Sequence, residues 1–153
     1  GGRISSLMFG IQWNLVLKHI ETKGAKTQEE LKTKSTDWGN YYDATFNITK
    51  GKYSEDMGYT FDDVGTEGYT KIENDGVLLT TGATSINSTL NIYDLAGNVW
   101  ESTLEQNTSS SNDPCALRGG SYGNYGVNYS ASNNFVSSTI SSNSYIGFRS
   151  TLW

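Results

Sequence analysis

The sequence predicts a single α+β domain that is rich in loops, and three observations carry this prediction. One segment, 11–20, has a clear helical period, and short apolar segments such as 77–81 end at glycine, as strands often do. The stretch 33–73 has aromatic residues spaced along it but no sustained period, which suggests long loops pinned to a core. The 153 residues are enough for one domain with a real core. The chain has seventeen Gly but only one Pro, so its irregular loops must be built mainly with Gly, Asn and Asp.

The segment 11–20 is predicted to be an amphipathic helix with its apolar side inward. Trp13 and Leu17 are four residues apart, so they lie on the same side of a helix. Further along, Thr27 and Glu30 have the spacing of a capping box, which predicts a second, short helical turn. The apolar positions that share the helical spacing are Trp13, Val16, Leu17 and Ile20.

Charge and composition exclude several classes of function. The net charge of −5 argues against a nucleic-acid partner, which normally needs a basic face. No apolar stretch approaches the ~20 residues of a membrane span. Cys115 is the sole cysteine, so an internal disulfide and a multi-cysteine metal site are excluded. Residues 1–9 are interpreted as a linker or cloning remnant, and 10–153 as the domain.

The last third of the chain contains a long uncharged stretch, residues 119–148, which we call the recognition run. Arg118 and Arg149 bracket it, and it holds no Asp, Glu, Lys, Arg or His. Its Tyr, Asn, Ser and Gly content is typical of antibody paratopes, where Tyr gives contact area and the others give adaptable hydrogen bonds. The alternative is a disordered polar linker, but strand-like segments flank the run. The candidate ligand-binding residues are Tyr122, Asn124, Tyr125, Asn128, Tyr129, Asn133, Asn134, Asn143 and Tyr145.

The segment 91–101 is a candidate metal site. Asp94 and Glu101 supply carboxylates, and carbonyl groups near Gly97 would add the oxygen ligands that suit calcium. The alternative interpretation is a tight turn closed by an Asx-type hydrogen bond.

Three motifs together carry a resemblance to a known family. They are the segments 93–101 (YDLAGNVWE), 117–122 (LRGGSY) and 147–149 (GFR), in this order. This combination resembles the formylglycine-generating enzyme (sulfatase-modifying factor) domain family. The resemblance implies a variant of the C-type lectin-like fold, α+β and loop-rich, with a short antiparallel sheet and adjacent termini. It also implies a calcium site formed by the Asp94 and Glu101 side chains with the Gly97 and Val99 carbonyls.

The chain departs from that family where its chemistry lies. The family oxidises a substrate cysteine with two cysteines placed shortly after the Gly-Gly-Ser motif, and these positions hold Asn124 and Tyr129 here. Cys115 precedes the motif and cannot replace both. Ser102 also stands where the family usually has a second tryptophan. We therefore expect no catalysis and no copper, and a divergent oxidase is the least favoured alternative.

A second group with the same fold resembles the chain more closely: the variable proteins of diversity-generating retroelements. That resemblance implies a display module on a phage tail or a bacterial surface, whose recognition run binds a protein or glycan receptor. Any oligomer would form through the parent protein. The remaining alternative is a calcium-dependent structural or glycan-binding lectin-like domain.

The same comparison separates residues expected to hold the fold from residues expected to bind. Trp100, Gly119, Gly120, Gly147 and Phe148 are expected to form the core and the close approach of the last strands. The tyrosines and asparagines of the recognition run are expected to lie on an exposed surface. Replacing Tyr122, Tyr125 and Tyr129 together by serine should then abolish binding without unfolding the domain.

Overall fold

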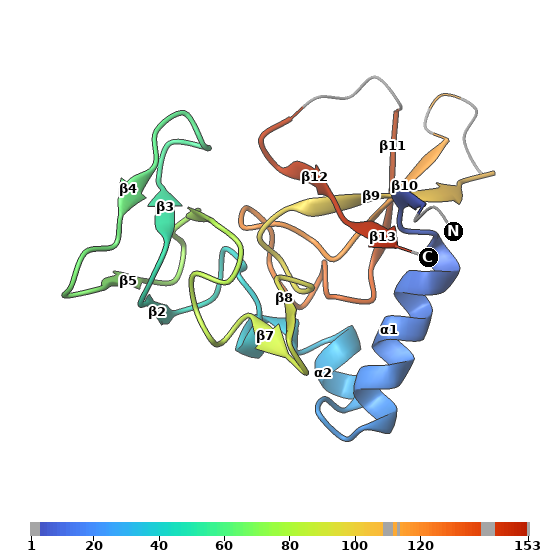
Figure 1. The fold of residues 1–153 in the computed structure, drawn as a ribbon, viewed down its shortest axis with the longest axis horizontal. Coiled ribbons are helices and arrows are strands. Elements are labelled where there is room, and N and C mark those ends of the chain that lie inside the picture. Colours follow the sequence, from blue (N-terminus) through green and yellow to red (C-terminus); the bar gives the residue numbers. More distant parts are fainter. Residues whose placement is uncertain (1–3, 109–111, 113, 139–142, 153) are drawn as a thin grey trace.

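The computed structural model describes residues 4–108, 112, 114–138 and 143–152, and within them it shows an α+β arrangement of short elements joined by long loops (Figure 1). The helices are α1 (Gly10–Thr22), α2 (Gln28–Lys32) and a 3-10 helix, Ser35–Trp38. The strands are β1 (Ser5–Leu7), β2 (Phe46–Ile48), β3 (Lys52–Ser54), β4 (Asp62–Asp63), β5 (Tyr69–Lys71), β6 (Leu78–Leu79), β7 (Ser88–Thr89), β8 (Ile92–Tyr93), β9 (Trp100–Gln106), β10 (Cys115–Arg118), β11 (Asn134–Ser137), β12 (Ile146–Phe148) and β13 (Ser150–Leu152). The predicted α+β class is confirmed.

The largest sheet has four strands in the order β11-β10-β9-β12, and we call it the main sheet. Strand β10 is antiparallel to both β9 and β11, whereas β12 runs parallel to β9. Strand β1 pairs with β13, which brings the two ends of the described chain together, as predicted (Figure 1). The helix α1 begins against the main sheet, because Gly10 contacts Glu105 and the Trp13 ring reaches Gly119.

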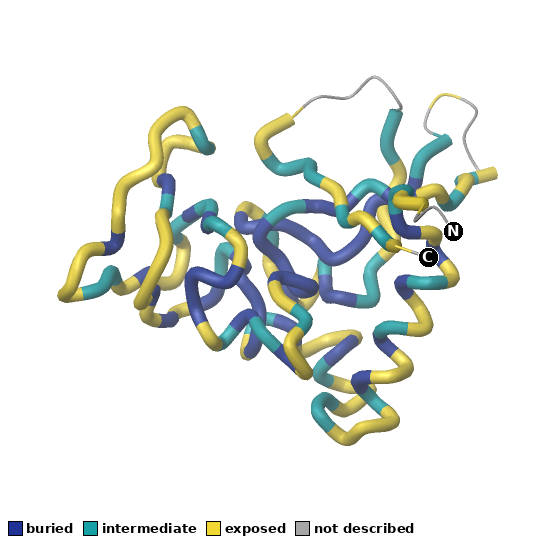
Figure 2. The backbone as a smooth tube through the Cα atoms, viewed as in Figure 1, coloured by how far each residue is buried: buried dark blue, intermediate teal, exposed yellow. Residues whose placement is uncertain are grey.

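Both helical predictions are confirmed. In α1, Trp13 and Ile20 are fully buried and Leu17 nearly so, and they belong to the central buried layer that Figure 2 shows. At the start of α2, the Glu30 amide donates to Thr27 Oγ1 at 3.2 Å, and the Thr27 amide donates to Glu30 Oε2 at 2.7 Å. These reciprocal bonds form the capping box and fix the first turn of α2.

A second lobe is formed by β2 to β6, to the left in Figure 1. Its strands have two or three residues each, and the sequence did not predict them because pieces this short show no period. The expectation that aromatic residues pin this region holds for Trp38, Tyr41 and Phe46, which are buried in the core. Val77 and Leu79 are also buried, as expected, although β6 includes only Leu78–Leu79.

The side chain of Asn98 ties irregular segments together in the middle of the fold. Its amide mimics a strand partner for Leu79: Nδ2 donates to the Leu79 carbonyl at 3.1 Å, and Oδ1 accepts from the Leu79 amide at 3.0 Å. Asn98 Oδ1 also accepts from Asn40 Nδ2 at 3.0 Å. Its backbone carbonyl accepts from the Tyr122 amide at 2.9 Å. Asn98 therefore supplies hydrogen bonds that these segments lack, because they belong to no continuous sheet.

Gly97 makes the approach of Asn98 and Asn40 possible. Its φ is +71°, in the region that side chains disfavour, and a Cβ there would overlap the Asn40 carbonyl. Gly65 has the same φ of +71° but has nothing within 4 Å of a Cβ position. Substitutions at the two glycines can therefore be compared to separate the effect of backbone strain from the effect of steric contact.

We predict that Gly97→Ala destabilises the domain by about 3 kcal/mol or more, because left-handed strain and overpacking add. Gly65→Ala, which carries the strain alone, should cost about 1 kcal/mol. Urea unfolding of both variants checks this. Equal losses for the two variants would show that the Asn40 contact does not constrain Gly97.

Candidate functional site

The face of the main sheet opposite α1 carries apolar side chains, of which Phe135 and Phe148 are exposed and Leu117 is buried. The strand registers place Phe135, Leu117 and Ser102 in one row across β11, β10 and β9. The register of β12 adds Phe148 to this row. The prediction that Phe148 belongs to the core is wrong, since 71% of it is exposed. Phe148 lies on β12, an edge strand of the main sheet, whereas Leu117 of the same row lies on the inner strand β10 and is buried.

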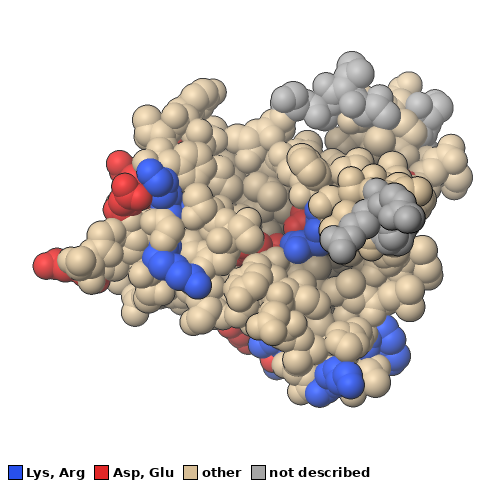
Figure 3. Space-filling view, in the orientation of Figure 1, with Lys and Arg blue, Asp and Glu red and all other residues tan. Residues whose placement is uncertain are grey.

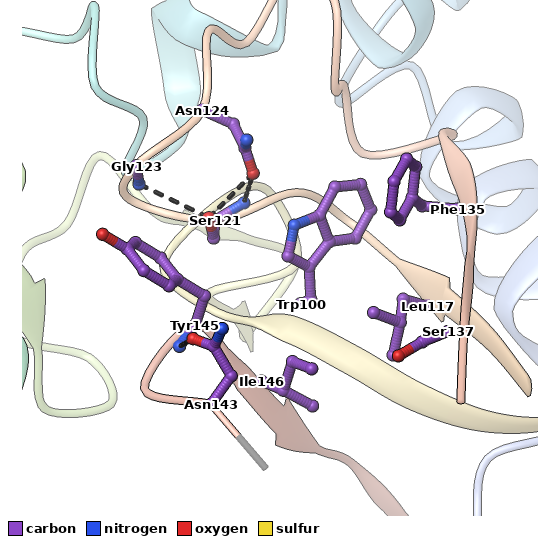
Figure 4. Close-up of a pocket in the computed structure, with 10 residues that line it drawn as sticks. All are labelled: Trp100, Leu117, Ser121, Gly123, Asn124, Phe135, Ser137, Asn143, Tyr145 and Ile146. Carbon is purple, nitrogen blue, oxygen red and sulfur yellow. Dashed lines mark hydrogen bonds between the residues drawn. The ribbon is translucent and has the colours of Figure 1, made fainter. Parts of the chain in front are cut away.

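A pocket of about 450 Å³ lies on this face, and we call it the sheet-face pocket (Figure 4). None of the residues that line it carries a formal charge, and three of them are aromatic. The indole of Trp100 forms part of its wall and packs on Phe135, with ring centroids 5.5 Å apart. The lining residues are Trp100, Leu117, Ser121, Gly123, Asn124, Phe135, Ser137, Asn143, Tyr145 and Ile146.

The predicted ligand-binding residues fall into distinct groups. Asn124, Asn143 and Tyr145 line the sheet-face pocket. Tyr125, Asn128 and Asn134 are exposed, whereas Tyr129 and Asn133 are half-buried. Residues 139–142 of the recognition run lie outside the described residues. The pocket walls formed by Trp100, Leu117, Phe135 and Ile146 were not predicted as binding residues, although Leu117 and Ile146 stand in the two strand-like flanks of the run.

The expectation that Tyr122 lies on an exposed surface is wrong. Only 1% of Tyr122 is exposed, and its ring stacks on Tyr145 with centroids 4.7 Å apart. Gly119 and Gly120 have φ of +90° and +77°, so the chain turns inward just before this residue. Burial also raises the pKa of the Tyr122 hydroxyl. Tyr122 therefore belongs to the core, and it contacts the pocket through Tyr145.

The turn 41–44 holds the recognition run from the side of the second lobe. The Tyr42 amide donates to the Asn124 carbonyl at 2.8 Å, and the Gly126 amide donates to Asp43 Oδ1 at 3.0 Å. The rings of Tyr42 and Tyr125 pack edge to face, with their centroids 5.7 Å apart. These contacts fix the segment 124–126 although it contains no helix or strand. The run is therefore anchored here, which argues against the linker interpretation for this segment.

The two carboxylates of the predicted calcium site are both buried, but Glu101 already has a cationic partner. Arg149 Nε donates to Glu101 Oε2 at 2.8 Å, and Arg149 Nη2 donates to Glu101 Oε1 at 2.6 Å. Arg149 Nη2 also donates to the Tyr93 carbonyl at 2.9 Å. Burial raises the pKa of Glu101, and the guanidinium opposes this shift. Figure 3 shows blue and red atoms meeting near the centre of the molecule, in a surface that is otherwise mostly tan.

The Asp94 carboxylate accepts hydrogen bonds from other groups. Its Oδ2 accepts from the Gly82 amide at 2.9 Å, and Asn87 Nδ2 lies 3.5 Å from its Oδ1. Among the described residues, no group of three or more His, Cys, Asp or Glu side chains is placed to hold a metal ion. Arg149 is thus the cationic partner of Glu101, and the Asp94 carboxylate accepts from an amide twelve residues away instead of closing an Asx-type turn. Calcium at this place stays a prediction, which a thermal melt with excess EDTA tests.

We predict that Arg149→Met costs about 3–5 kcal/mol at neutral pH, because it leaves the buried Glu101 charge unpaired. The folded pKa of Glu101 would then rise further above its unfolded value. The folded state would bind a proton at higher pH than the unfolded state, so part of the loss should be regained as pH falls through the folded pKa. Urea unfolding of the variant and the wild type at neutral and mildly acidic pH checks this.

The matched control is the double variant Arg149→Met/Glu101→Gln. It removes the unpaired charge, so most of the stability should return and the additional pH dependence should disappear. An unchanged loss in the double variant would show that Arg149 stabilises the fold through packing alone.

Comparison with known proteins agrees with the motifs. A family model, the sulfatase-modifying factor enzyme 1-like domain, matches residues 21–152. Comparisons with the curated proteins and with the solved structures returned no match. In the described part of the chain, no helix is both long and apolar enough to cross a membrane. The family match covers most of the chain and includes every residue of the sheet-face pocket. The chain belongs to the sulfatase-modifying factor enzyme 1-like domain family.

Proposed function

We propose that this chain is a non-catalytic ligand-binding module that uses the sheet-face pocket and the recognition run around it. One observation carries the proposal: the pocket combines aromatic walls with amide and hydroxyl groups and has no charged lining residue. Such a lining suits an uncharged group of a ligand, because apolar contacts give affinity and a few polar groups give orientation. The ligand class is a protein or glycan receptor.

The two positions of the family's cysteine pair support the absence of catalysis. Asn124 lines the pocket, and its Oδ1 accepts from Ser121 Oγ at 2.7 Å. The Tyr129 ring packs edge to face against the rings of Trp100 and Phe135, with ring centroids 5.7 Å and 6.1 Å away, respectively. An amide and a phenol at these positions cannot exchange a disulfide. One of the two positions, Asn124, thus lines the pocket with an amide group, which supports binding in place of redox chemistry.

The finer assignment is a C-type lectin-like display module of the diversity-generating type, on a phage tail or a bacterial surface. The composition of the recognition run supports it, since Tyr and Asn are dense where the pocket opens. The anchoring of residues 124–126 by the turn 41–44 also supports it, because a display surface needs a fixed backbone under changeable side chains.

The DNA that flanks the gene tests this assignment. We predict a reverse-transcriptase gene nearby and a near-copy of the coding region for the recognition run. Adenines in that copy should mark the codons of exposed residues such as Asn128 and Asn143, whereas codons for Gly119 and Gly120 should be unchanged. Absence of such a copy from the complete locus would contradict diversification and leave ligand binding as a separate question.

Some residues of the recognition run should affect ligand binding without affecting stability, whereas others should affect stability. Tyr125→Ser combined with Asn143→Ser changes only exposed residues, so it should shift stability by about 1 kcal/mol or less and weaken ligand binding by about tenfold or more. Tyr122→Ser removes a buried ring and should cost about 3–5 kcal/mol. Thermal melts and binding to arrays of surface glycans and surface proteins check both.

The wild-type domain must first bind at least one array component. If the Tyr125/Asn143 variant then binds the same component equally well, the pocket and its surroundings are not the binding surface. A collapsed melt for this variant would instead show that the exposed residues support the fold.

A further inference from the structure

A hairpin of the second lobe ends in an exposed apolar tip that the proposed function does not use. The tip joins β3 to β4, comprises residues 55–61, and projects from the lobe at the left of Figure 1. Met57 is 53% exposed, Tyr59 is 88% exposed and Phe61 is 39% exposed. None of the three lines the sheet-face pocket. Three adjacent exposed apolar side chains on one short loop are typical of an interaction surface.

The tip is held in one shape by a hydrogen-bonded turn. Asp56 Oδ1 accepts from Ser54 Oγ at 2.6 Å and from the Thr60 amide at 2.9 Å, and Oδ2 accepts from Thr60 Oγ1 at 2.6 Å. The bonds from Ser54 and Thr60 lower the pKa of Asp56 to about 2, so the carboxylate persists throughout the physiological range. Ser54 Oγ in turn accepts from the Gly58 amide at 2.8 Å.

The backbone at the tip is strained as well as ordered. Met57 has a φ of 63°, which is uncommon for a residue with a side chain, and Gly58 follows with a φ of 90°. Such strain persists only where surrounding contacts determine the conformation, as the Asp56 network does here. Because the apolar side chains are already presented on a fixed loop, little conformational entropy remains to be lost on binding.

The charges around the tip select among partners. Glu55, Asp62 and Asp63 flank the apolar residues, and on this side of the molecule Figure 3 shows both red and blue groups. Lys52 Nζ pairs with Asp63 Oδ1 at 3.4 Å, and Glu55 Oε1 accepts from the Tyr69 hydroxyl. Among the described residues, neither Glu55 nor Asp62 forms an ion pair. Anionic lipid and nucleic acid would be repelled. The surface therefore suits a basic partner.

A second copy of the chain is a poor candidate for that partner. Three of the lysines on α1 and around α2 are already engaged in ion pairs within the chain. These ion pairs are Lys18–Glu21, Lys26–Glu30 and Lys34–Glu29. The chain as a whole is also acidic, with a net charge of −5.

We propose that Met57, Tyr59 and Phe61 form a second docking surface, which inserts into an apolar depression with a Lys- and Arg-rich rim on a partner protein. Tyr59 is the expected anchor, because exposed aromatic residues dominate interface energies. The acidic flanks steer the encounter and fix its orientation. This surface acts independently of the sheet-face pocket.

A random peptide library displayed on phage tests the proposal with the folded domain as bait. Selected peptides should combine apolar or aromatic residues with Lys or Arg. The variant Met57→Ser/Tyr59→Ser/Phe61→Ser should bind them about tenfold or more weakly. Raising the salt concentration to about 0.5 M should also weaken binding, because it screens the flanking charges.

Two control variants distinguish specific binding at the tip from non-specific hydrophobic binding. Ile72→Ser removes an apolar residue of the same lobe that is 60% exposed, and it should leave binding unchanged. Glu55→Gln/Asp62→Asn keeps the apolar tip and should reduce the salt dependence of binding. Melting temperatures of all variants should match that of the wild type.

The proposal is overturned by any of four results. These are no enrichment over uncoated support, selected peptides that are neutral or acidic, equal binding by the tip variant, or tip-dependent self-association of the wild type in sedimentation. A tip variant that fails to fold is replaced by Tyr59→Ser alone, which should still lower the affinity severalfold.

Discussion

The rest of the structure depends on the hydrogen bonds of one buried asparagine. The Asn98 side chain pairs with both backbone groups of Leu79 and accepts from Asn40, while its own carbonyl accepts from Tyr122. Sheets with strands of two or three residues provide few ladder bonds, so a side chain must satisfy the buried groups between them. Gly97 makes this possible because it lets the Asn40 backbone approach closely. The second lobe, the turn 41–44 and the recognition run are positioned through this point.

The one-sided packing of the main sheet explains where the pocket lies. On the α1 side, Glu105 pairs with Arg118, and Arg118 and the neighbouring Thr103 are buried. On the other side, the row from Phe135 to Phe148 has no helix over it. An antiparallel sheet with one covered face commonly leaves its second face to solvent. Here that face carries apolar side chains, and this departure from the usual alternation supports the proposal that it binds a ligand.

Local features could be predicted from the sequence, whereas pairings between residues far apart in the chain could not. The periodicity of Trp13 and Leu17 and the capping box at Thr27 gave correct helices, because they depend on neighbours within a turn. The motif containing Asn98 was recognised, but its partner Leu79 lies 19 residues away. The partner of Glu101, Arg149, is 48 residues away, so the sequence did not predict the ion pair that this carboxylate forms. Composition also gave no means to distinguish the buried Tyr122 from the exposed Tyr125.

The same long-range architecture explains how one stretch of chain can serve both folding and the proposed recognition. Within the recognition run, a buried minority that includes Tyr122, Ser130 and Ala131 packs inward. Ala131 is held through its amide to Ser35 Oγ at 3.0 Å, and its carbonyl accepts from the Trp13 indole at 2.9 Å. These contacts reach the backbone of Ala131, so they are insensitive to side-chain identity. Because the backbone is tied at such points, intervening exposed residues can change without altering the path of the chain, which is the property a variable binding surface requires.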